Sequence, residues 1–242
     1  MKREYHKWYS PNLQKEMELL VFGHAGTRVL FFPCRNGRFF DYEDWRVIES
    51  VRDKIEAGVF QFFCVDSVDA EGLYNIYIRP EDRILRHIQY ENYIIEEVLP
   101  FTRNVNPHIS MISAGCSLGA FHAVNVAMKY PQYFSKVVGM SGRYDLTWSV
   151  GFFRDLFDGY RNENIYFNSP SQFMNNLGEE TILAQLKRLD IILVIGKEDA
   201  FLENNYYFSH ILSSKGINHQ FYLWDEEAHK ARYWRKMVPL YI

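Results

Sequence analysis

Two side chains that could act as nucleophiles stand next to each other in S-A-G-C-S-L-G, residues 113–119. The letters G-C-S-L-G match the pattern G-x-S-x-G, in which a sharp, strained turn between a strand and a helix exposes the central serine. In that register Ser117 is the nucleophile. The alternative is a thiolate at Cys116, which would put both glycines out of register. Because a free cysteine is usually a small buried packing residue, we predict that Ser117 does the chemistry.

A serine nucleophile needs a base that takes its proton and an acid that orients the base. After such a turn they follow in the order serine, acid, histidine. The run D-I-I-L-V-I leads into G-K-E-D-A, which places Asp199 on the loop at the carboxyl end of a strand. The run H-Q-F-Y-L-W leads into D-E-E-A-H-K, which places His229 on the next loop. We therefore predict Asp199 as the acid and His229 as the base.

Each of these two assignments has rivals in the sequence. Glu198 adjoins Asp199, Asp145 follows the preceding strand, and Asp225 lies only four residues before His229. Other histidines stand on helices or near turns, where a structural role is the default: His24, His87, His108, His122, His210 and His219. Only His229 satisfies the chain order on the last loop.

When a serine attacks a carbonyl group, the carbonyl oxygen becomes an oxyanion. Two backbone N–H groups are needed to bind it. One should be the N–H of Leu118, at the start of the helix after the serine, and the other should come from the loop F-P-C-R-N-G-R-F-F. Pro33 has no N–H to donate. We predict Arg35 as the second donor, with Cys34 as the alternative.

These residues need a sheet to position them, and the chain alternates short apolar runs with longer segments of helical period. That alternation is typical of a mostly parallel sheet with helices on both faces. Runs such as V-L-F-F are apolar throughout, as expected for strands buried on both faces. The predicted strands are 16–22, 27–32, 59–65, 108–114, 136–140, 190–195 and 219–224, with 4–9 as an added edge strand. The first two are expected to form a hairpin around residues 24–26.

The helices follow from apolar residues at a spacing close to 3.6. The predicted helices are 42–57, 80–99, 118–130, 201–215 and 231–241. Pro100 is expected to end the second of them, and Gly216 to end the fourth. The segment 142–178 is loop-like and crowded with aromatic rings, so we expect an insertion over one end of the sheet.

Composition narrows the class of protein. The 242 residues carry a formal net charge of -3, with 48% hydrophobic and 24% charged residues, which indicates one folded domain and argues against a nucleic-acid partner. No run has the ~18 apolar residues of a membrane helix, and the N-terminus lacks the apolar core of a secretory signal. Three cysteines that are far apart predict reduced thiols in the cytoplasm. The sequence does not predict the oligomeric state.

Three segments together resemble one family. The first is the stretch G-C-S-L-G-A-F-H-A-V-N-V-A-M-K-Y-P-Q-Y-F-S-K-V-V-G-M-S-G, and the others are I-G-K-E-D-A and A-H-K-A-R-Y-W-R-K-M-V-P. They resemble the esterase D-like and feruloyl-esterase-like enzymes of the α/β-hydrolases, the putative esterase family. N-G-R-F-F-D-Y-E-D-W and N-I-Y-F-N-S-P are similar to a bacterial subgroup without an assigned substrate. The resemblance implies the α/β-hydrolase fold, with a twisted sheet of about eight strands.

The chain departs from the family pattern at two places. Pro33, Cys34 and Arg35 stand where the family usually has His-Gly in its oxyanion loop, and Ala231 stands where it often has Trp, while Trp234 is retained.

The resemblance implies a serine hydrolase that cleaves carboxylic esters through an acyl-enzyme intermediate, with Ser117, Asp199 and His229 as its triad. The expected partner is a small-molecule ester, and neither a metal nor an organic cofactor is expected. An acyltransferase would use the same triad and pass the acyl group to another acceptor. A non-catalytic binding protein with a vestigial triad is the alternative from another class.

Overall fold

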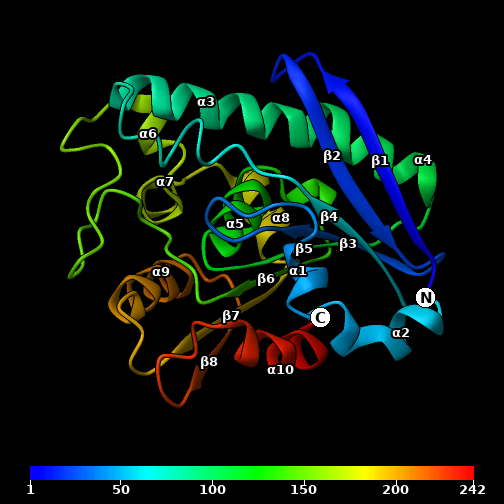
Figure 1. The fold of residues 1–242 in the computed structure, drawn as a ribbon. Coiled ribbons are helices and arrows are strands. Elements are labelled where there is room, and N and C mark those ends of the chain that lie inside the picture. The colour runs from blue at the N-terminus through cyan, green and yellow to red at the C-terminus, as the bar shows by residue number, and fades with distance from the viewer.

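A computed structural model describes all 242 residues and places eight strands in one sheet with the order β1-β2-β4-β3-β5-β6-β7-β8 (Figure 1). The strands are β1 (Arg3–Ser10), β2 (Lys15–Phe22), β3 (Thr27–Phe32), β4 (Phe60–Val65), β5 (Met111–Cys116), β6 (Lys136–Met140), β7 (Asp190–Gly196) and β8 (Gln220–Trp224). The strands from β3 to β8 run parallel, whereas β2 pairs antiparallel with both β1 and β4. The predicted sheet of about eight mostly parallel strands is confirmed.

Helices cover both faces of this sheet, as predicted (Figure 1). They are α1 (Asp41–Asp44), α2 (Arg52–Glu56), α3 (Pro80–Tyr93), α4 (Leu99–Val105), α5 (Leu118–Lys129), α6 (Glu163–Tyr166), α7 (Pro170–Asn176), α8 (Glu180–Leu186), α9 (Leu202–Ser214) and α10 (Ala231–Tyr241). Three short turns are the 3-10 turns η1 (Glu49–Val51) and η3 (Pro131–Tyr133) and the π-helical turn η2 (Ile94–Val98).

The core lies in two layers, one on each face of the sheet. Buried residues of α3, α5, α7 and α9 form a cluster of 33 with one face. Buried residues of α1, α2 and α10 form a cluster of 26 with the other. All six residues of β4 and all six of β5 are buried, because each strand has neighbours on both sides and helices above and below. The central strands therefore have hydrogen-bonded strands on both sides and packed helices on both faces.

The predicted hairpin between β2 and β3 is wrong. β4 lies between these two strands: Leu19 of β2 pairs with Val65, and Thr27 of β3 pairs with Phe60. β4 is apolar and needs a neighbour on each side, whereas β2 already has β1. The chain crosses the end of β4 between Gly23 and Gly26, both with φ in the left-handed region, at 100° and 90°.

Two predicted helices also differ from the structure. The segment 42–57 is divided into α1, η1 and α2, because Arg46 adopts a left-handed φ of 55° that no helix continues through. Pro100 does not end its helix. It lies in the first turn of α4, directly after the π-helical turn η2, where the missing proline N–H is tolerated.

The remaining predicted helices are confirmed as α5, α9 and α10, and Gly216 follows α9 with φ of 65°. The segment 142–178 leaves the carboxyl end of β6 and holds two short helices, α6 and α7, that were not predicted. None of the helices has the length and apolar character required to cross a membrane.

Candidate functional site

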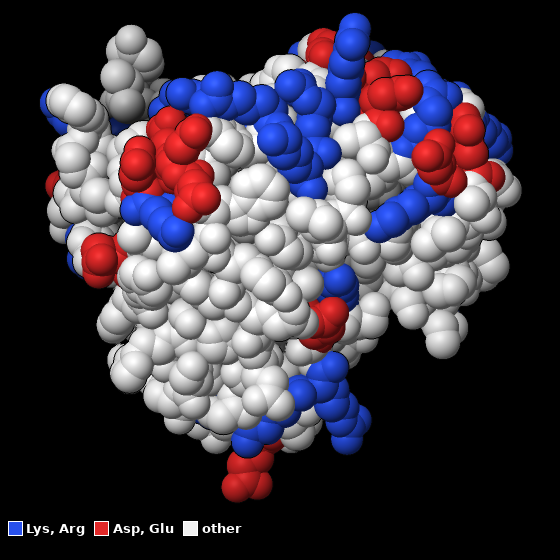
Figure 2. All heavy atoms as spheres, turned by 90° about the horizontal axis from the view of Figure 1, so that it is seen from below, with Lys and Arg blue, Asp and Glu red and all other residues white.

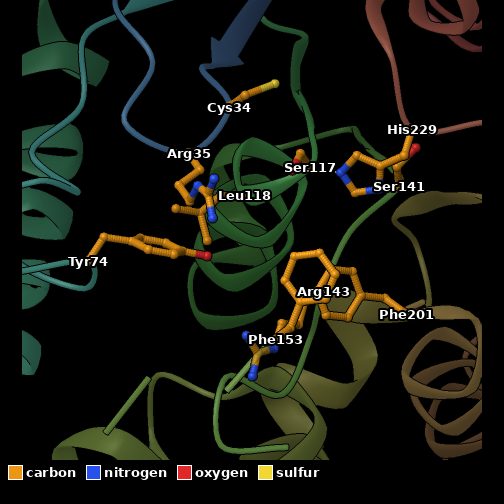
Figure 3. A pocket seen from close by; sticks show the side chains of 10 residues that line it. All are labelled: Cys34, Arg35, Tyr74, Ser117, Leu118, Ser141, Arg143, Phe153, Phe201 and His229. Atoms are coloured by element: carbon orange, nitrogen blue, oxygen red, sulfur yellow. Dashed lines mark hydrogen bonds between the residues drawn. The ribbon is translucent and has the colours of Figure 1, made fainter. Parts of the chain in front are cut away.

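Ser117 stands on a sharp turn between the last residue of β5 and the first of α5. Its backbone has φ of 57° and ψ of -123°, a strained conformation for a residue with a side chain. The Ser117 N–H donates to the carbonyl of Met140 at the end of β6, 2.8 Å away. The turn is thus attached to the neighbouring strand while the serine side chain projects into a pocket (Figure 3).

The glycines on either side of this turn allow close backbone contacts. A Cβ at Gly115 would lie 2.3 Å from the carbonyl carbon and oxygen of Gly119, and a Cβ at Gly119 would lie 2.2 Å from the carbonyl oxygen of Phe32. Both distances are far inside van der Waals contact. Helix α5 can therefore approach β5 and β3 only with glycine at both positions, which is the register that places Ser117 at the centre.

The structure brings Ser117, His229 and Asp199 together. His229 Nε2 lies 2.9 Å from Ser117 Oγ, and His229 Nδ1 lies 2.7 Å from Asp199 Oδ2. The other carboxylate oxygen of Asp199 accepts the N–H of Phe201 at 2.9 Å. The Asp199 side chain is only 2% exposed, so water does not compete for these bonds. The three groups form one continuous chain of hydrogen bonds from the carboxylate to the serine.

The loop that carries His229 is tied to β6 and α10. Ser141 Oγ donates to the carbonyl of Ala228 at 3.0 Å and accepts the Trp234 Nε1–H at 3.3 Å. The His229 ring also packs edge-on against Trp234, with the ring centroids 5.9 Å apart. Ser141 therefore connects the histidine loop to the indole that lies beside it.

The rival acids lie elsewhere. Asp145 accepts hydrogen bonds from Thr147 and Gln172 within its own segment. Asp225 forms an ion pair with Lys197 at 2.7 Å, and Glu198 is exposed. None of the three contacts His229, so the structure leaves Asp199 as its carboxylate partner.

The other histidines lie outside this chain of hydrogen bonds. His122 and His87 are buried beside each other on α5 and α3, with ring centroids 5.4 Å apart. His122 Nε2 bonds to Asp69 Oδ1 at 3.0 Å. His219 Nε2 lies 2.6 Å from Ser209 Oγ on α9.

Cys116, the alternative nucleophile, is fully buried at the end of β5. Burial raises the pKa of its thiol well above the ordinary value, because a thiolate would lose its hydration there. Its backbone N–H donates to Tyr42 Oη at 3.0 Å. The neighbour of Ser117 is thus a protonated packing residue.

The residues predicted to supply oxyanion donors lie at the same pocket. The Leu118 N–H is the first of α5, where a helix offers no acceptor. Arg35 and Cys34, in the loop after β3, line the pocket together with Leu118. The N–H groups of Leu118, Arg35 and Cys34 donate to no protein acceptor.

The pocket has a volume of about 310 Å³, enough for a small organic molecule. Its wall consists of Cys34, Arg35, Tyr74, Ser117, Leu118, Ser141, Arg143, Phe153, Phe201 and His229 (Figure 3). The sequence analysis did not single out Tyr74 or Phe201, and it gave no role to Ser141 or Arg143. Ser141 and Arg143 follow directly after β6, so the rule that sites form at the carboxyl ends of parallel strands could have identified both. No cluster of three or more His, Cys, Asp or Glu side chains is arranged to hold a metal ion.

Known proteins resemble this chain in sequence family and in fold. A family model described as "Putative esterase" matches residues 85–237. No curated protein matches the chain by sequence. Among solved structures, an S-formylglutathione hydrolase from Agrobacterium tumefaciens superimposes with a TM-score of 0.75 at 14% identity, covering 99% of this chain and 94% of the other. A ferulic acid esterase gives 0.74 at 15% identity, with 98% and 95% covered.

A third similar structure is the fluorophosphonate-binding serine hydrolase F of Staphylococcus aureus, with a TM-score of 0.68 at 14% identity, covering 98% of this chain and 95% of the other. At identities of 14–15%, these similarities show a shared fold and no more.

Proposed function

The chain belongs to the family described as "Putative esterase" and is a carboxylic ester hydrolase, and we propose that Ser117, His229 and Asp199 carry out the hydrolysis through an acyl-enzyme. The observation that carries this proposal is the hydrogen-bonded chain from Asp199 through His229 to Ser117, at 2.7 Å and 2.9 Å. A nucleophile, a base and a group that orients the base are the parts that such a reaction needs.

The first step transfers a proton and forms a covalent bond. Asp199 accepts the Nδ1–H of His229, which leaves Nε2 as the acceptor that faces Ser117. As the Ser117 oxygen attacks the ester carbonyl, its proton moves to Nε2, and the imidazolium then protonates the departing alcohol. Water attacks the acyl-enzyme in the reverse sense: His229 takes a proton from the water and returns one to Ser117, releasing the acid.

The oxyanion formed in each step needs donors that already point at it. We assign this role to the N–H of Leu118 and to the N–H of Arg35, with Cys34 as the alternative second donor. All three N–H groups lack a protein acceptor and belong to residues that line the pocket. Helix α5 adds the positive end of its dipole beside Leu118.

The substrate on this proposal is a small-molecule ester, and the segment 142–178 supplies part of the wall that holds it. Arg143 and Phe153, both from this segment, line the pocket, and the ring centroids of Phe153 and Phe201 lie 4.6 Å apart. We also infer that the enzyme acts in the cytoplasm, because its three cysteines are free thiols and all of them are buried.

Labelling with a fluorophosphonate probe, beside turnover of short p-nitrophenyl esters, tests the proposal. We expect wild type and Cys116→Ala to be labelled and active, and Ser117→Ala to lose both properties. Retention of labelling and turnover by Ser117→Ala would exclude this nucleophile. Loss of both in Cys116→Ala alone would instead favour the thiol.

The base has a separate test in its own replacement. His229→Gln removes the group that accepts the serine proton, so kcat should fall by about 100-fold or more. Unchanged turnover in His229→Gln would exclude His229 as the base.

A further inference from the structure

The pocket around Ser117 carries an uneven charge. Two of its lining residues, Arg35 and Arg143, are permanently charged, and no Asp or Glu is among the ten. The outer surface differs: on the face in Figure 2, Lys and Arg side chains lie among Asp and Glu. The positive sign of the pocket is therefore a local property, in a chain whose formal net charge is -3.

Arg143 brings its charge into the protein without an ion pair. Its side chain is buried, with 4% exposed. Nε donates to the backbone carbonyl of Asp145, and Nη2 donates to those of Leu146, Trp148 and Arg154, at distances from 2.8 to 3.2 Å. Carbonyl groups satisfy these N–H donors but do not cancel the charge. Nη1 donates to no protein atom, so its two N–H groups remain available to a ligand.

The carboxylates closest along the chain are occupied by other donors. Asp145 accepts from Thr147 and Gln172, and Asp155 pairs with Arg161 at 2.8 Å. Burial lowers the pKa of Arg143, but a guanidinium stays protonated in proteins. The charges of Asp145 and Asp155 oppose this lowering, but neither carboxylate forms an ion pair with Arg143. A bound anion in direct contact with the guanidinium would therefore stabilise the buried charge further.

Arg35 and Tyr74 continue this wall toward the oxyanion loop. The exposed Arg35 guanidinium lies over the Tyr74 ring, 5.2 Å from its centroid. In Figure 3 the Tyr74 hydroxyl points into the pocket. Burial raises the pKa of this hydroxyl, while the charges of Arg143 and Arg35 oppose the rise. Tyr74 is therefore a protonated donor near two guanidinium groups.

We propose that this enzyme prefers esters that carry a carboxylate in addition to the reacting ester, and that Arg35, Tyr74 and Arg143 bind that carboxylate. The proposal rests on the function assigned above to the pocket. Guanidinium groups match the planar, two-oxygen geometry of a carboxylate. Phe153 and Phe201 line the same pocket and offer packing for an apolar or aromatic body between the carboxylate and the ester.

Binding to Ser117→Ala tests the preference without turnover. The probes are 4-acetoxybenzoate, with the carboxylate on the alcohol side, and methyl 4-carboxybenzoate, with the carboxylate on the acyl side. Each is compared by calorimetry with the analogue in which a primary amide replaces the carboxylate. We expect the anion of at least one pair to bind about tenfold more tightly than its amide.

Arg35→Gln, in the Ser117→Ala background, should reduce that ratio to about twofold or less, and Arg35→Lys should retain more of it because the charge stays. Arg188→Gln is the matched control, since Arg188 is exposed and does not line the pocket. Arg143→Gln should also reduce the ratio. Because Arg143 holds carbonyls of residues 145–154, circular dichroism and the affinity for the neutral amide show whether that variant keeps its fold.

Equal affinity for anion and amide in both pairs, or no binding of either, would overturn the proposal. It would also be overturned if the preference survived in both Arg35→Gln and Arg143→Gln. Neither result bears on whether Ser117 is labelled by a fluorophosphonate, so the triad and the carboxylate preference stand or fall separately.

Discussion

The side-chain hydroxyl of Ser141 donates a hydrogen bond to the backbone carbonyl of Ala228, 3.0 Å away and one residue before His229. Both residues adopt left-handed φ values, 56° for Ser141 and 49° for Ala228, which few residues other than glycine adopt without strain. The hydrogen bond joins two strained turns, one at the end of β6 and one in the histidine loop. It therefore helps to determine where the imidazole lies.

Replacement of this serine should affect both catalysis and folding. Ser141→Ala removes the donor to Ala228 and the acceptor for Trp234 Nε1, and it leaves two buried polar groups unpaired. We expect a loss of unfolding free energy of roughly 1–3 kcal/mol and a fall in kcat of about tenfold. Urea denaturation and ester turnover measure the two effects. Ser214→Ala, which removes a hydroxyl on α9 far along the chain, is the control, and an equal kcat in both variants would contradict this role.

The glycine at the start of α5 gives a second prediction. In Gly119→Ala the new methyl group would lie 2.2 Å from the Phe32 carbonyl oxygen, so α5 must move away from β3. Such overpacking costs about 1–3 kcal/mol, and the movement carries Ser117 and the Leu118 N–H away from their positions. We expect labelling of Ser117 by a fluorophosphonate to slow strongly. Gly178→Ala, with open space around its Cβ, should change neither property; similar behaviour of the two variants would refute the close-contact argument.

A third prediction concerns the loop that offers the oxyanion donors. Asp69 Oδ2 accepts the Asn36 N–H at 3.3 Å, while its Oδ1 bonds to His122 of α5. Asp69 thus joins the loop of Arg35 to the helix of Ser117. Asp69→Asn keeps the size but loses one acceptor, so we expect kcat to fall about tenfold with a smaller change in KM. Asp53→Asn, at an exposed position of α2, is the matched control, and a change confined to KM would argue against the oxyanion loop as the cause.

Much of the sheet could be predicted from the sequence, because the central strands are apolar over their whole length. Strand order could not. The turn G-H-A-G is compatible with a hairpin or with a crossing, and only the need of β4 for two neighbours decides between them. Pro100 was misjudged for a related reason: a proline ends a regular helix, but the π-helical turn before it shifts the hydrogen bonding so that the helix continues.

The candidate triad could be predicted because its chain order and its positions after predicted strands are recognisable sequence patterns. No comparable pattern identifies Tyr74, Ser141 or Arg143. Each is an ordinary residue in a loop, and its position becomes meaningful only when distant segments meet around Ser117. Asp69 is similar, since nothing local shows that it will contact both Asn36 and His122.

His87 gives a prediction about stability and pH. It is 3% exposed, it stacks on His122, and its Nε2 has no hydrogen-bond partner. Burial first, and then the nearby charges of His122 and Lys129, lower its pKa well below 6.5, against which Asn168 acts weakly. The folded state therefore resists protonation, while the unfolded chain takes up a proton below about pH 6.5. The contribution of His87 to the unfolding free energy is therefore fully present above about pH 6.5 and is lost as the pH falls.

The expected loss of unfolding free energy from His87 between pH 7 and pH 5.5 is about 1 kcal/mol. His87→Leu replaces the titrating imidazole with an apolar side chain of similar size. The unfolding free energy of this variant should therefore fall less over the same pH interval. Urea denaturation at the two pH values gives the difference for each protein. His210→Leu, at an exposed position of α9, should follow wild type. If the difference between the two pH values were the same for His87→Leu and wild type, His87 would have to be protonated in the fold, against the burial that surrounds it.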